Sequence, residues 1–252
     1  MYLELIPPYI VIFLFGIVIG SFLNVCILRI PKHETIVTER SHCMSCGYQL
    51  SWYDMVPVFS WLCLGGKCRK CKAKISSQYP IVEATNGILY VLVFVVQGFN
   101  LASILYCLMT SALIVLSVID WRTYEIPIGI NIFILILGIL MTVLDYQNWL
   151  SHLIGFLCVS VVLYLLFLVS GGRAIGGGDI KLMAAAGLLI GWKCIILAFL
   201  LGCIVGSIIH IIRMKVSNAD RVLAMGPYLA FGIFIATLWG PQLIDWYLSL
   251  LF

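Results

Sequence analysis

Long apolar segments dominate this sequence and limit what it can fold into. Eight runs are apolar enough to cross about 30 Å of membrane hydrocarbon as helices, although the sixth run is short. These runs cover residues 9–28, 81–96, 101–119, 126–144, 149–170, 180–192, 194–212 and 223–243. The sequence therefore predicts an all-α polytopic membrane protein with about eight transmembrane helices.

The composition disfavours several other classes of protein. Apolar residues make up 63% of the 252 positions and charged residues only 10%, with a mean hydropathy of +1.11. Soluble domains contain about 45–50% apolar residues, so a soluble enzyme, a disordered chain and a secreted disulfide scaffold are disfavoured. The net charge of +4 is small, and most basic residues lie in one stretch. This distribution indicates sidedness in membrane lipid and implies no nucleic-acid partner.

The basic residues also indicate how the chain crosses the membrane. With eight alternating spans, fourteen of the fifteen lysines and arginines fall on one face, and only Lys193 falls on the other. Because cytoplasmic loops of membrane proteins are rich in lysine and arginine, that face is predicted to be cytoplasmic. Both termini are then predicted to be external.

One hydrophilic region interrupts the apolar sequence. It covers residues 29–80, lies on the predicted cytoplasmic face, and is near the size at which a domain needs a metal ion or disulfides to stay folded. We therefore predict three parts: a first transmembrane helix at 1–28, a cytoplasmic insertion at 29–80, and a transmembrane domain at 81–252.

Four of the ten cysteines form a pattern typical of metal binding. Two Cys-x-x-Cys pairs, Cys43 with Cys46 and Cys68 with Cys71, are separated by 21 residues, which is near the spacing of four-thiolate zinc sites. A disulfide is disfavoured in the reducing cytoplasm, and a thioredoxin-like site lacks its βαβ context. Four protein ligands leave no open position on the metal. The insertion is therefore predicted to bind a structural zinc ion.

Two aspartates are candidates for chemistry, because ionisable residues at membrane depth are costly and commonly functional. Asp120 ends the third apolar run and Asp179 opens the sixth, so both are predicted to lie at the cytoplasmic face. Glycines before Asp179 indicate irregular backbone beside a watery cavity, and hence a substrate groove. These glycines are Gly176, Gly177 and Gly178.

A pair of aspartates at low dielectric has a specific chemical use. Both carboxylates cannot ionise together, so they share a proton. Such a pair can activate water for hydrolysis, as in aspartic proteases. Spacing alone leaves an alternative open, in which each aspartate pairs separately with a basic neighbour, namely Arg122, Arg173 or Lys181.

Several motifs together resemble those of the type IV prepilin peptidases, and the match extends over nearly the whole chain. The motifs are GSFLNVCILRIP at 20–31, the two Cys-x-x-Cys pairs, WYDMVP at 52–57, YPIVE at 79–83, Asp120 with Ile126-Pro127, and GGGDIKL at 176–182. Their order along the chain is what makes the resemblance specific to this family.

The resemblance implies a GxGD-type intramembrane aspartyl protease of the bacterial inner membrane, with Asp120 and Asp179 as the catalytic pair. It implies cleavage of the basic leader of type IV prepilins or pseudopilins at the cytoplasmic face. It also implies N-methylation of the new amino terminus with S-adenosylmethionine, which the family links to the cysteine-bearing insertion. The alternatives are a peptidase without methyl transfer, a cation-coupled transporter that uses the two aspartates, and a zinc-stabilised adaptor without chemistry.

Overall fold

The structure is a computed structural model that describes residues 6–37, 40–173, 175–217 and 223–251. The chain divides into two units, Met1–Phe99 and Asn100–Phe252. Helices build both units, and the described ranges contain no β-strand apart from two isolated bridges. The predicted all-α fold class is thus confirmed.

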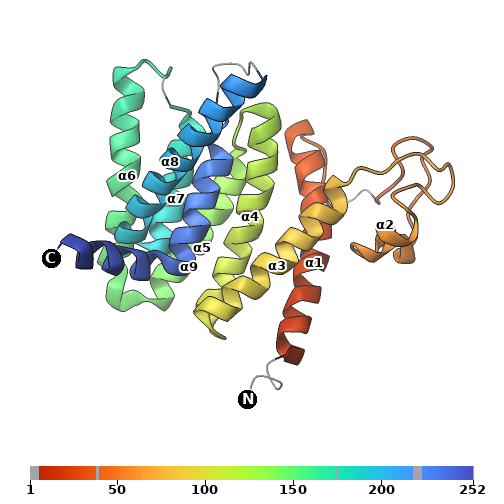
Figure 1. Ribbon diagram of the computed structural model, residues 1–252, viewed down its shortest axis with the longest axis horizontal. Coiled ribbons are helices and arrows are strands. Elements are labelled where there is room, and N and C mark those ends of the chain that lie inside the picture. Colours follow the sequence, from red (N-terminus) through yellow and green to blue (C-terminus); the bar gives the residue numbers. More distant parts are fainter. Residues whose placement is uncertain (1–5, 38–39, 174, 218–222, 252) are drawn as a thin grey trace. The chain divides into compact units, whose positions relative to one another are not determined.

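The first unit is built on two long helices, α1 (Ile6–Arg29) and α3 (Gln78–Gln97), which run in opposite directions against each other (Figure 1). Their backbones approach closely, since a Cβ atom added at Gly16 would lie 2.6 Å from the Cα atom of Gly87. The Asn86 amide donates to the carbonyl oxygen of Gly16 at 2.7 Å. Small residues and buried polar contacts are typical of helix packing in lipid, where little hydrophobic force draws helices together.

The hydrophilic insertion connects α1 to α3 and contains little regular structure. Its short elements are the 3-10 helices η2 (Ile30–Lys32) and η3 (Trp52–Met55), the helix α2 (Phe59–Cys63), and the bridges His42 to Gln49 and Lys67 to Lys74. Within residues 40–76, only Gly66 and Cys68 are buried. The insertion therefore lacks an apolar core of its own, as expected of a segment that a metal ion holds together.

The described part of the second unit contains six α-helices. They are α4 (Leu101–Thr123), α5 (Ile128–Leu144), α6 (Trp149–Val169), α7 (Gly177–Ile190), α8 (Trp192–Ser217) and α9 (Gly226–Leu251), with the 3-10 helix η4 (Tyr146–Asn148) before α6. Helix α7 packs against α5, α6 and α8, while α9 packs against α8 and α4. The largest apolar side chains of α7 that are fully buried are those of Leu182, Met183 and Leu189.

Glycines set the close packing of α7 against its neighbours. A Cβ atom added at Gly187 of α7 would overlap the carbonyl oxygen of Gly155 on α6. On α5, a Cβ atom added at Gly138 would lie 3.2 Å from the carbonyl oxygen of Ala185. These contacts leave α7 little freedom to slide, and its first turn carries Asp179.

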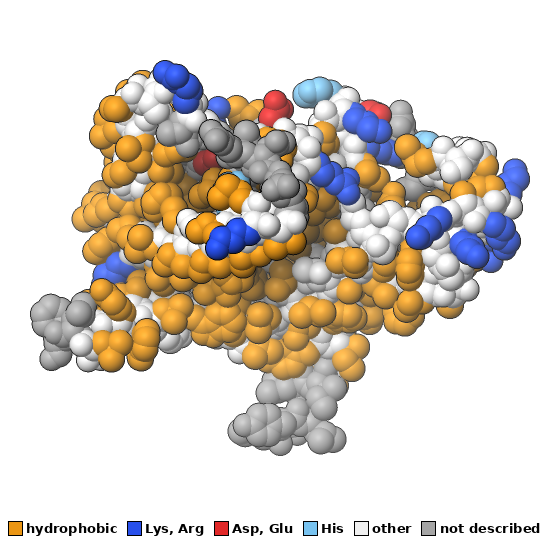
Figure 2. All heavy atoms as spheres, turned by 45° about the horizontal axis from the view of Figure 1, so that its top comes forward, with side chains coloured by type: hydrophobic (Ala, Val, Ile, Leu, Met, Phe, Trp, Pro, Cys, Tyr) orange, Lys and Arg blue, Asp and Glu red, His pale blue; other side chains and the backbone are white. Residues whose placement is uncertain are grey.

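The eight predicted apolar runs correspond to α1 and to α3 through α9. Within the described residues, six of these helices are long and apolar enough to cross a membrane: α1, α3, α4, α6, α8 and α9. Helix α5 has 17 residues and α7 has 14, so the number of spans is close to the predicted eight without being fixed at eight. Figure 2 shows a broad hydrophobic surface on one face of the molecule, as expected of a protein that contacts lipid.

Two helices continue beyond the predicted apolar runs. Helix α8 ends at Ser217 and α9 at Leu251, whereas the runs end at residues 212 and 243. Long charged side chains can reach the membrane interface from a helix end, so Lys215 does not stop α8. The last predicted run already contains Pro241, which membrane helices tolerate, and α9 continues past it and past Asp245. Hydropathy alone underestimates both helices for these reasons.

The packing groups α3 with α1, so residues 81–97 belong to the first unit of the structure. The predicted parts at 1–28, 29–80 and 81–252 divide the chain by chemistry and hydropathy instead. That division stays a prediction.

Candidate active site and metal centre

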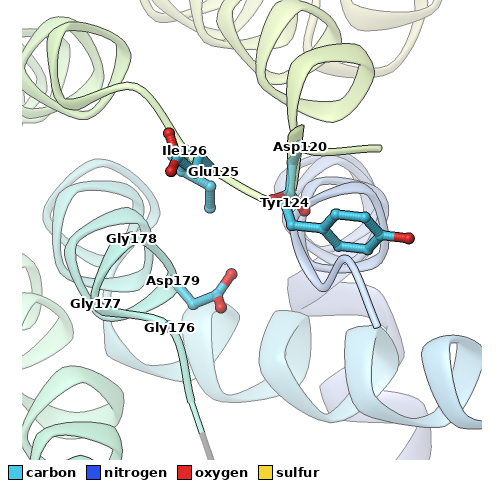
Figure 3. Close-up of a pocket in the computed structure, with 8 residues that line it drawn as sticks. All are labelled: Asp120, Tyr124, Glu125, Ile126, Gly176, Gly177, Gly178 and Asp179. Carbon is cyan, nitrogen blue, oxygen red and sulfur yellow. The ribbon is translucent and has the colours of Figure 1, made fainter. Parts of the chain in front are cut away.

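A cavity of about 300 Å³ lies where α4 ends and α7 begins, within the second unit (Figure 3). Its lining residues are Asp120, Tyr124, Glu125, Ile126, Gly176, Gly177, Gly178 and Asp179. The structure thus brings both predicted aspartates and all three predicted groove glycines to one cavity. The cavity is open enough to hold water beside two carboxylates.

Asp120 is held in place by the start of α9. The residue lies in the last turn of α4, is 4% exposed, and accepts a 2.8 Å hydrogen bond from the backbone N–H of Gly226. Gly226 is the first residue of the 26-residue helix α9, so the carboxylate lies at the positive end of a helix dipole. Both the N–H group and the dipole favour the ionised form of Asp120.

Glycine is the residue that fits at position 226 without displacing Asp120. A Cβ atom added at Gly226 would lie 2.7 Å from Oδ2 of Asp120 and 3.0 Å from a methyl carbon of Leu116. The sequence pattern does not identify Gly226 as part of the site, because 106 residues separate it from Asp120. The available signal is the pair Gly226-Pro227, which lies near the start of the last apolar run, on the same predicted face.

Asp179 lies in a different environment from Asp120. Figure 3 shows its carboxylate pointing into the cavity, toward Asp120 and Tyr124. Its Oδ1 atom is buried and has no hydrogen-bond partner among the described residues. Asn131 of α5 donates to the carbonyl oxygen of Gly178 at 3.3 Å, and its own Oδ1 atom is likewise buried without a partner in that part of the chain. Buried acceptors without donors are uncommon, and a proton on Asp179 would supply a donor at this site.

The connection between α4 and α5 folds over the start of α7. Tyr124 ends α4 in the left-handed conformation, with φ of 57°, and its N–H donates to the carbonyl oxygen of Asp120 at 2.9 Å. Ile126 then covers Gly178, where an added Cβ atom would lie 2.8 Å from the Cβ atom of Ile126. The turn also brings Glu125 to the cavity wall, an exposed carboxylate that the sequence pattern does not single out.

Neither aspartate forms an ion pair within the described ranges of the chain. Asp120 accepts a hydrogen bond from a backbone N–H, and Asp179 has an oxygen without a partner there. The alternative of two separate ion pairs, with Arg122, Arg173 or Lys181 as partners, therefore does not describe this structure. Both carboxylates face one cavity and are available to a reactant.

The four predicted zinc ligands converge within the first unit. The Sγ atoms of Cys43, Cys46, Cys68 and Cys71 all lie within 4.8 Å of one another, and those of Cys43 and Cys71 are 3.8 Å apart. In a tetrahedral site with Zn–S bonds of about 2.3 Å, neighbouring sulfur atoms are about 3.8 Å apart. The cluster could therefore hold one metal ion with four protein ligands.

Both Cys-x-x-Cys pairs adopt the same turn. In each pair, the N–H of the first cysteine donates at 2.8 Å to the carbonyl oxygen five residues later. The residue after the second cysteine is left-handed in both turns: Gly47 has φ of 68° and Lys72 has φ of 61°. Such a backbone costs a lysine about 1–2 kcal/mol. The two turns therefore present their cysteine pairs on the same backbone geometry.

The protonation of the cluster also fits a bound cation. The N–H groups of Ser45 and Cys46 lower the pKa of the Cys43 thiol to about 6. The N–H of Ala73 lowers the pKa of Cys71, but desolvation and the neighbouring cysteines outweigh it and raise that pKa to about 11. The thiols of Cys43 and Cys71 therefore do not ionise together near neutral pH unless a positive charge joins them.

Known proteins resemble both units of the chain. Residues 14–97 match the family model described as the bacterial peptidase A24 N-terminal domain, and residues 107–211 match the type IV leader peptidase family. A prepilin leader peptidase/N-methyltransferase of Aeromonas salmonicida is 32% identical over 94% of this chain and 93% of its own length. The protein of that name from Pseudomonas aeruginosa is 33% identical over 94% of this chain and 92% of its own length. No solved structure shows a significant match.

Proposed function

The chain belongs to the type IV leader peptidase family, and from this membership we propose that it cleaves the basic leader from type IV prepilins or pseudopilins and then N-methylates the new amino terminus. The observation that carries the proposal is the cavity shared by Asp120 and Asp179. A transporter or an adaptor without chemistry is not favoured, because neither would account for relatives named as both peptidase and methyltransferase.

The different surroundings of the two aspartates suit acid–base hydrolysis. We assign Asp120 as the ionised base that takes a proton from the attacking water, since it is paired with the N–H of Gly226. We assign Asp179 as the protonated acid that donates to the oxygen of the scissile carbonyl. The water oxygen bonds to the carbonyl carbon, and the peptide C–N bond then breaks. Asp120 passes its proton to the leaving amine, while Asp179 regains a proton from the tetrahedral intermediate.

We propose that the cavity and the insertion face the cytoplasm from the bacterial inner membrane. Support comes from the charge bias, which puts all but one of the fifteen lysines and arginines on that face. A prepilin has a basic leader in the cytoplasm followed by an apolar helix. Its scissile bond would therefore reach the membrane at the same face as Asp120 and Asp179.

We assign the methyl transfer to the part of the chain that holds the cysteine cluster, with S-adenosylmethionine as the methyl donor. Cys43, Cys46, Cys68 and Cys71 would hold a zinc ion. With four protein ligands, the ion would supply folding free energy to the insertion and no open position for a reactant. The groove glycines Gly176, Gly177 and Gly178 are proposed to let the extended substrate approach the aspartates closely.

The sidedness can be tested with a thiol reagent that does not cross membranes. Cys63 is exposed in the insertion and is not part of the cysteine cluster. It should be protected in intact cells and labelled in inverted vesicles, because the insertion is proposed to be cytoplasmic. A Gln147→Cys variant serves as the opposite control and should be labelled in intact cells. Labelling of Cys63 in intact cells would reverse the topology.

The aspartate pair can be tested by replacing each carboxylate with an amide. Asp120→Asn and Asp179→Asn should each abolish prepilin cleavage, because the base and the acid cannot replace each other. The double variant should be no worse than either single variant, as for residues that act as a unit. Asp245→Asn, which changes a carboxylate of α9 outside the cavity lining, should leave cleavage unchanged. Turnover of either single variant within about tenfold of the parent, roughly 1.4 kcal/mol in barrier, would reject the pair.

The placement of Asp120 by α9 can be tested with Gly226→Ala. The added methyl group would lie 2.7 Å from Oδ2 of Asp120 and would displace the carboxylate. Because small displacements of a catalytic group cost up to about a hundredfold in rate, kcat for cleavage should fall by about that factor while zinc content stays unchanged. Gly129→Ala is the matched control, since a Cβ atom there meets no atom within 4 Å. Equal kcat in both variants would contradict the assigned role of Gly226.

The zinc assignment can be tested by metal analysis and by separating the two activities. The purified protein should contain one zinc ion per chain, and Cys68→Ser should lose it and loosen the insertion. Methyl transfer should then fall before cleavage does, because the aspartates lie outside the insertion. Cys63→Ser, which changes a cysteine outside the cluster, should keep both the metal and the methylation. Loss of cleavage with methyl transfer intact would contradict the assignment of methyl transfer to the insertion and of cleavage to the aspartates.

A further inference from the structure

An exposed group of apolar side chains lies on η3 and α2 of the insertion. Its most exposed members are Trp52, Leu62 and Phe59, which are 77%, 60% and 56% exposed. The group, called here the η3–α2 patch, consists of Trp52, Tyr53, Met55, Val56, Phe59 and Leu62. Contiguous apolar surface of this kind marks a contact with lipid or with another chain, because water alone does not stabilise it.

The depth of the patch follows from its attachment to α3. The backbone N–H of Val58, next to Phe59, donates to Oε2 of Glu83 at 2.7 Å. Glu83 is the sixth residue of α3, so it lies about 8 Å along the helix from Gln78. The 20 residues of α3 span about 30 Å, which equals the thickness of the membrane hydrocarbon. The segment at Val58 is therefore held below the level at which α3 enters the membrane.

Two further features hold α2 at this level. The indole N–H of Trp61 donates to the carbonyl oxygen of Ile75, close before α3, at 3.3 Å. Val58 itself has φ of 64°, a conformation that β-branched residues rarely adopt and that persists only where surrounding contacts enforce it. In Figure 1, α2 lies alongside the pair of α1 and α3 and not beyond its end.

The charges around the patch are predominantly positive. Residues 52–76 contain five lysines and arginines, Lys67, Arg69, Lys70, Lys72 and Lys74, and one carboxylate, that of Asp54. Arg69 bonds to Asp54 at 2.7 Å, and its guanidinium group lies 4.9 Å from the ring centre of Tyr53. The remaining lysines are exposed. Four zinc-bound thiolates would contribute a net charge of −2, so the positive excess would persist.

We infer that the η3–α2 patch inserts into the boundary between headgroups and acyl chains of an anionic phospholipid leaflet, with the neighbouring lysines on the lipid phosphates. Tryptophan and tyrosine favour this boundary because one part of each ring system is apolar and another is polar. Basic residues beside an apolar face strengthen binding to anionic lipid. Figure 2 shows Lys and Arg side chains beside hydrophobic ones at the right-hand end, where Figure 1 places the insertion.

The inference can be tested by photo-crosslinking of the full-length protein in nanodiscs of phosphatidylcholine with phosphatidylglycerol. The crosslinking residue p-benzoylphenylalanine replaces Phe59 in one variant and Leu62 in another. Both should give lipid adducts by mass spectrometry. Met44, which is 76% exposed on the first cysteine turn, is the matched position and should give no lipid adduct above background. Adducts at positions 59 and 62 with residues 100–252 or with an added prepilin, in place of lipid, would overturn the inference.

The charge component has its own measurement. Lys70→Gln with Lys74→Gln should lower the lipid adduct yield at position 59 in discs that contain phosphatidylglycerol, by about fivefold or more. The same pair should have little effect in discs of phosphatidylcholine alone, where there is no net negative charge to bind. Equal loss in both kinds of disc would contradict recognition of anionic lipid. Two measurements on each variant serve as controls. Zinc content shows whether the insertion is still folded, and prepilin cleavage shows whether the proposed function holds independently of lipid contact.

Discussion

Inside a bilayer, every backbone polar group needs a partner within the protein or a water-filled cavity, and this requirement shapes the second unit. Helix α7 has 14 residues and spans about 21 Å, less than the roughly 30 Å of hydrocarbon. A membrane span built on α7 would therefore place non-helical backbone, such as the glycines before it, at membrane depth, where lipid cannot pair it. Ile126 covers Gly178, and all three groove glycines line the cavity. Helices α5 and α6 close on the later part of α7, at Gly138 and Gly155.

The packing of the helices also gives the two aspartates different hydrogen-bond partners. One carboxylate receives the N–H of Gly226 at the start of α9, while the other has a buried oxygen without a donor in the described residues. In a pair that shares one proton at low dielectric, the oxygen of Asp179 without a donor would favour the proton on that residue, because a hydrogen bond to the charged form favours that form. The proposed roles of base and acid thus rest on the different surroundings of the two carboxylates, of which one meets the start of α9.

Local sequence patterns predict much of this protein, and long-range packing explains what they miss. Hydropathy over about 20 residues predicts the long helices. The two residues between the cysteines of each Cys-x-x-Cys pair predict the metal-binding cluster. Both features depend on residues that are close together in the chain. The contact of Gly226 with Asp120 depends on how α9 packs against α4, which hydropathy does not encode. The grouping of α3 with α1 likewise depends on the contact of Gly16 with Gly87. Asn131 is missed for the same reason, since only folding brings it to Gly178.

The insertion shows how a metal ion could hold a segment that few apolar contacts support. The backbone of Val58, with φ of 64° and ψ of −55°, costs about 1–3 kcal/mol, and its hydrogen bond to the Glu83 carboxylate returns about as much. With two buried residues in 40–76, apolar burial adds little. Zinc binding to a four-thiolate site contributes about 10–16 kcal/mol at pH 7, far more than this strain. A bound zinc ion and Glu83 would therefore act on one segment. Loss of the ion would first release the proposed membrane contact of α2 and would reach Asp120 and Asp179, in the other unit, last.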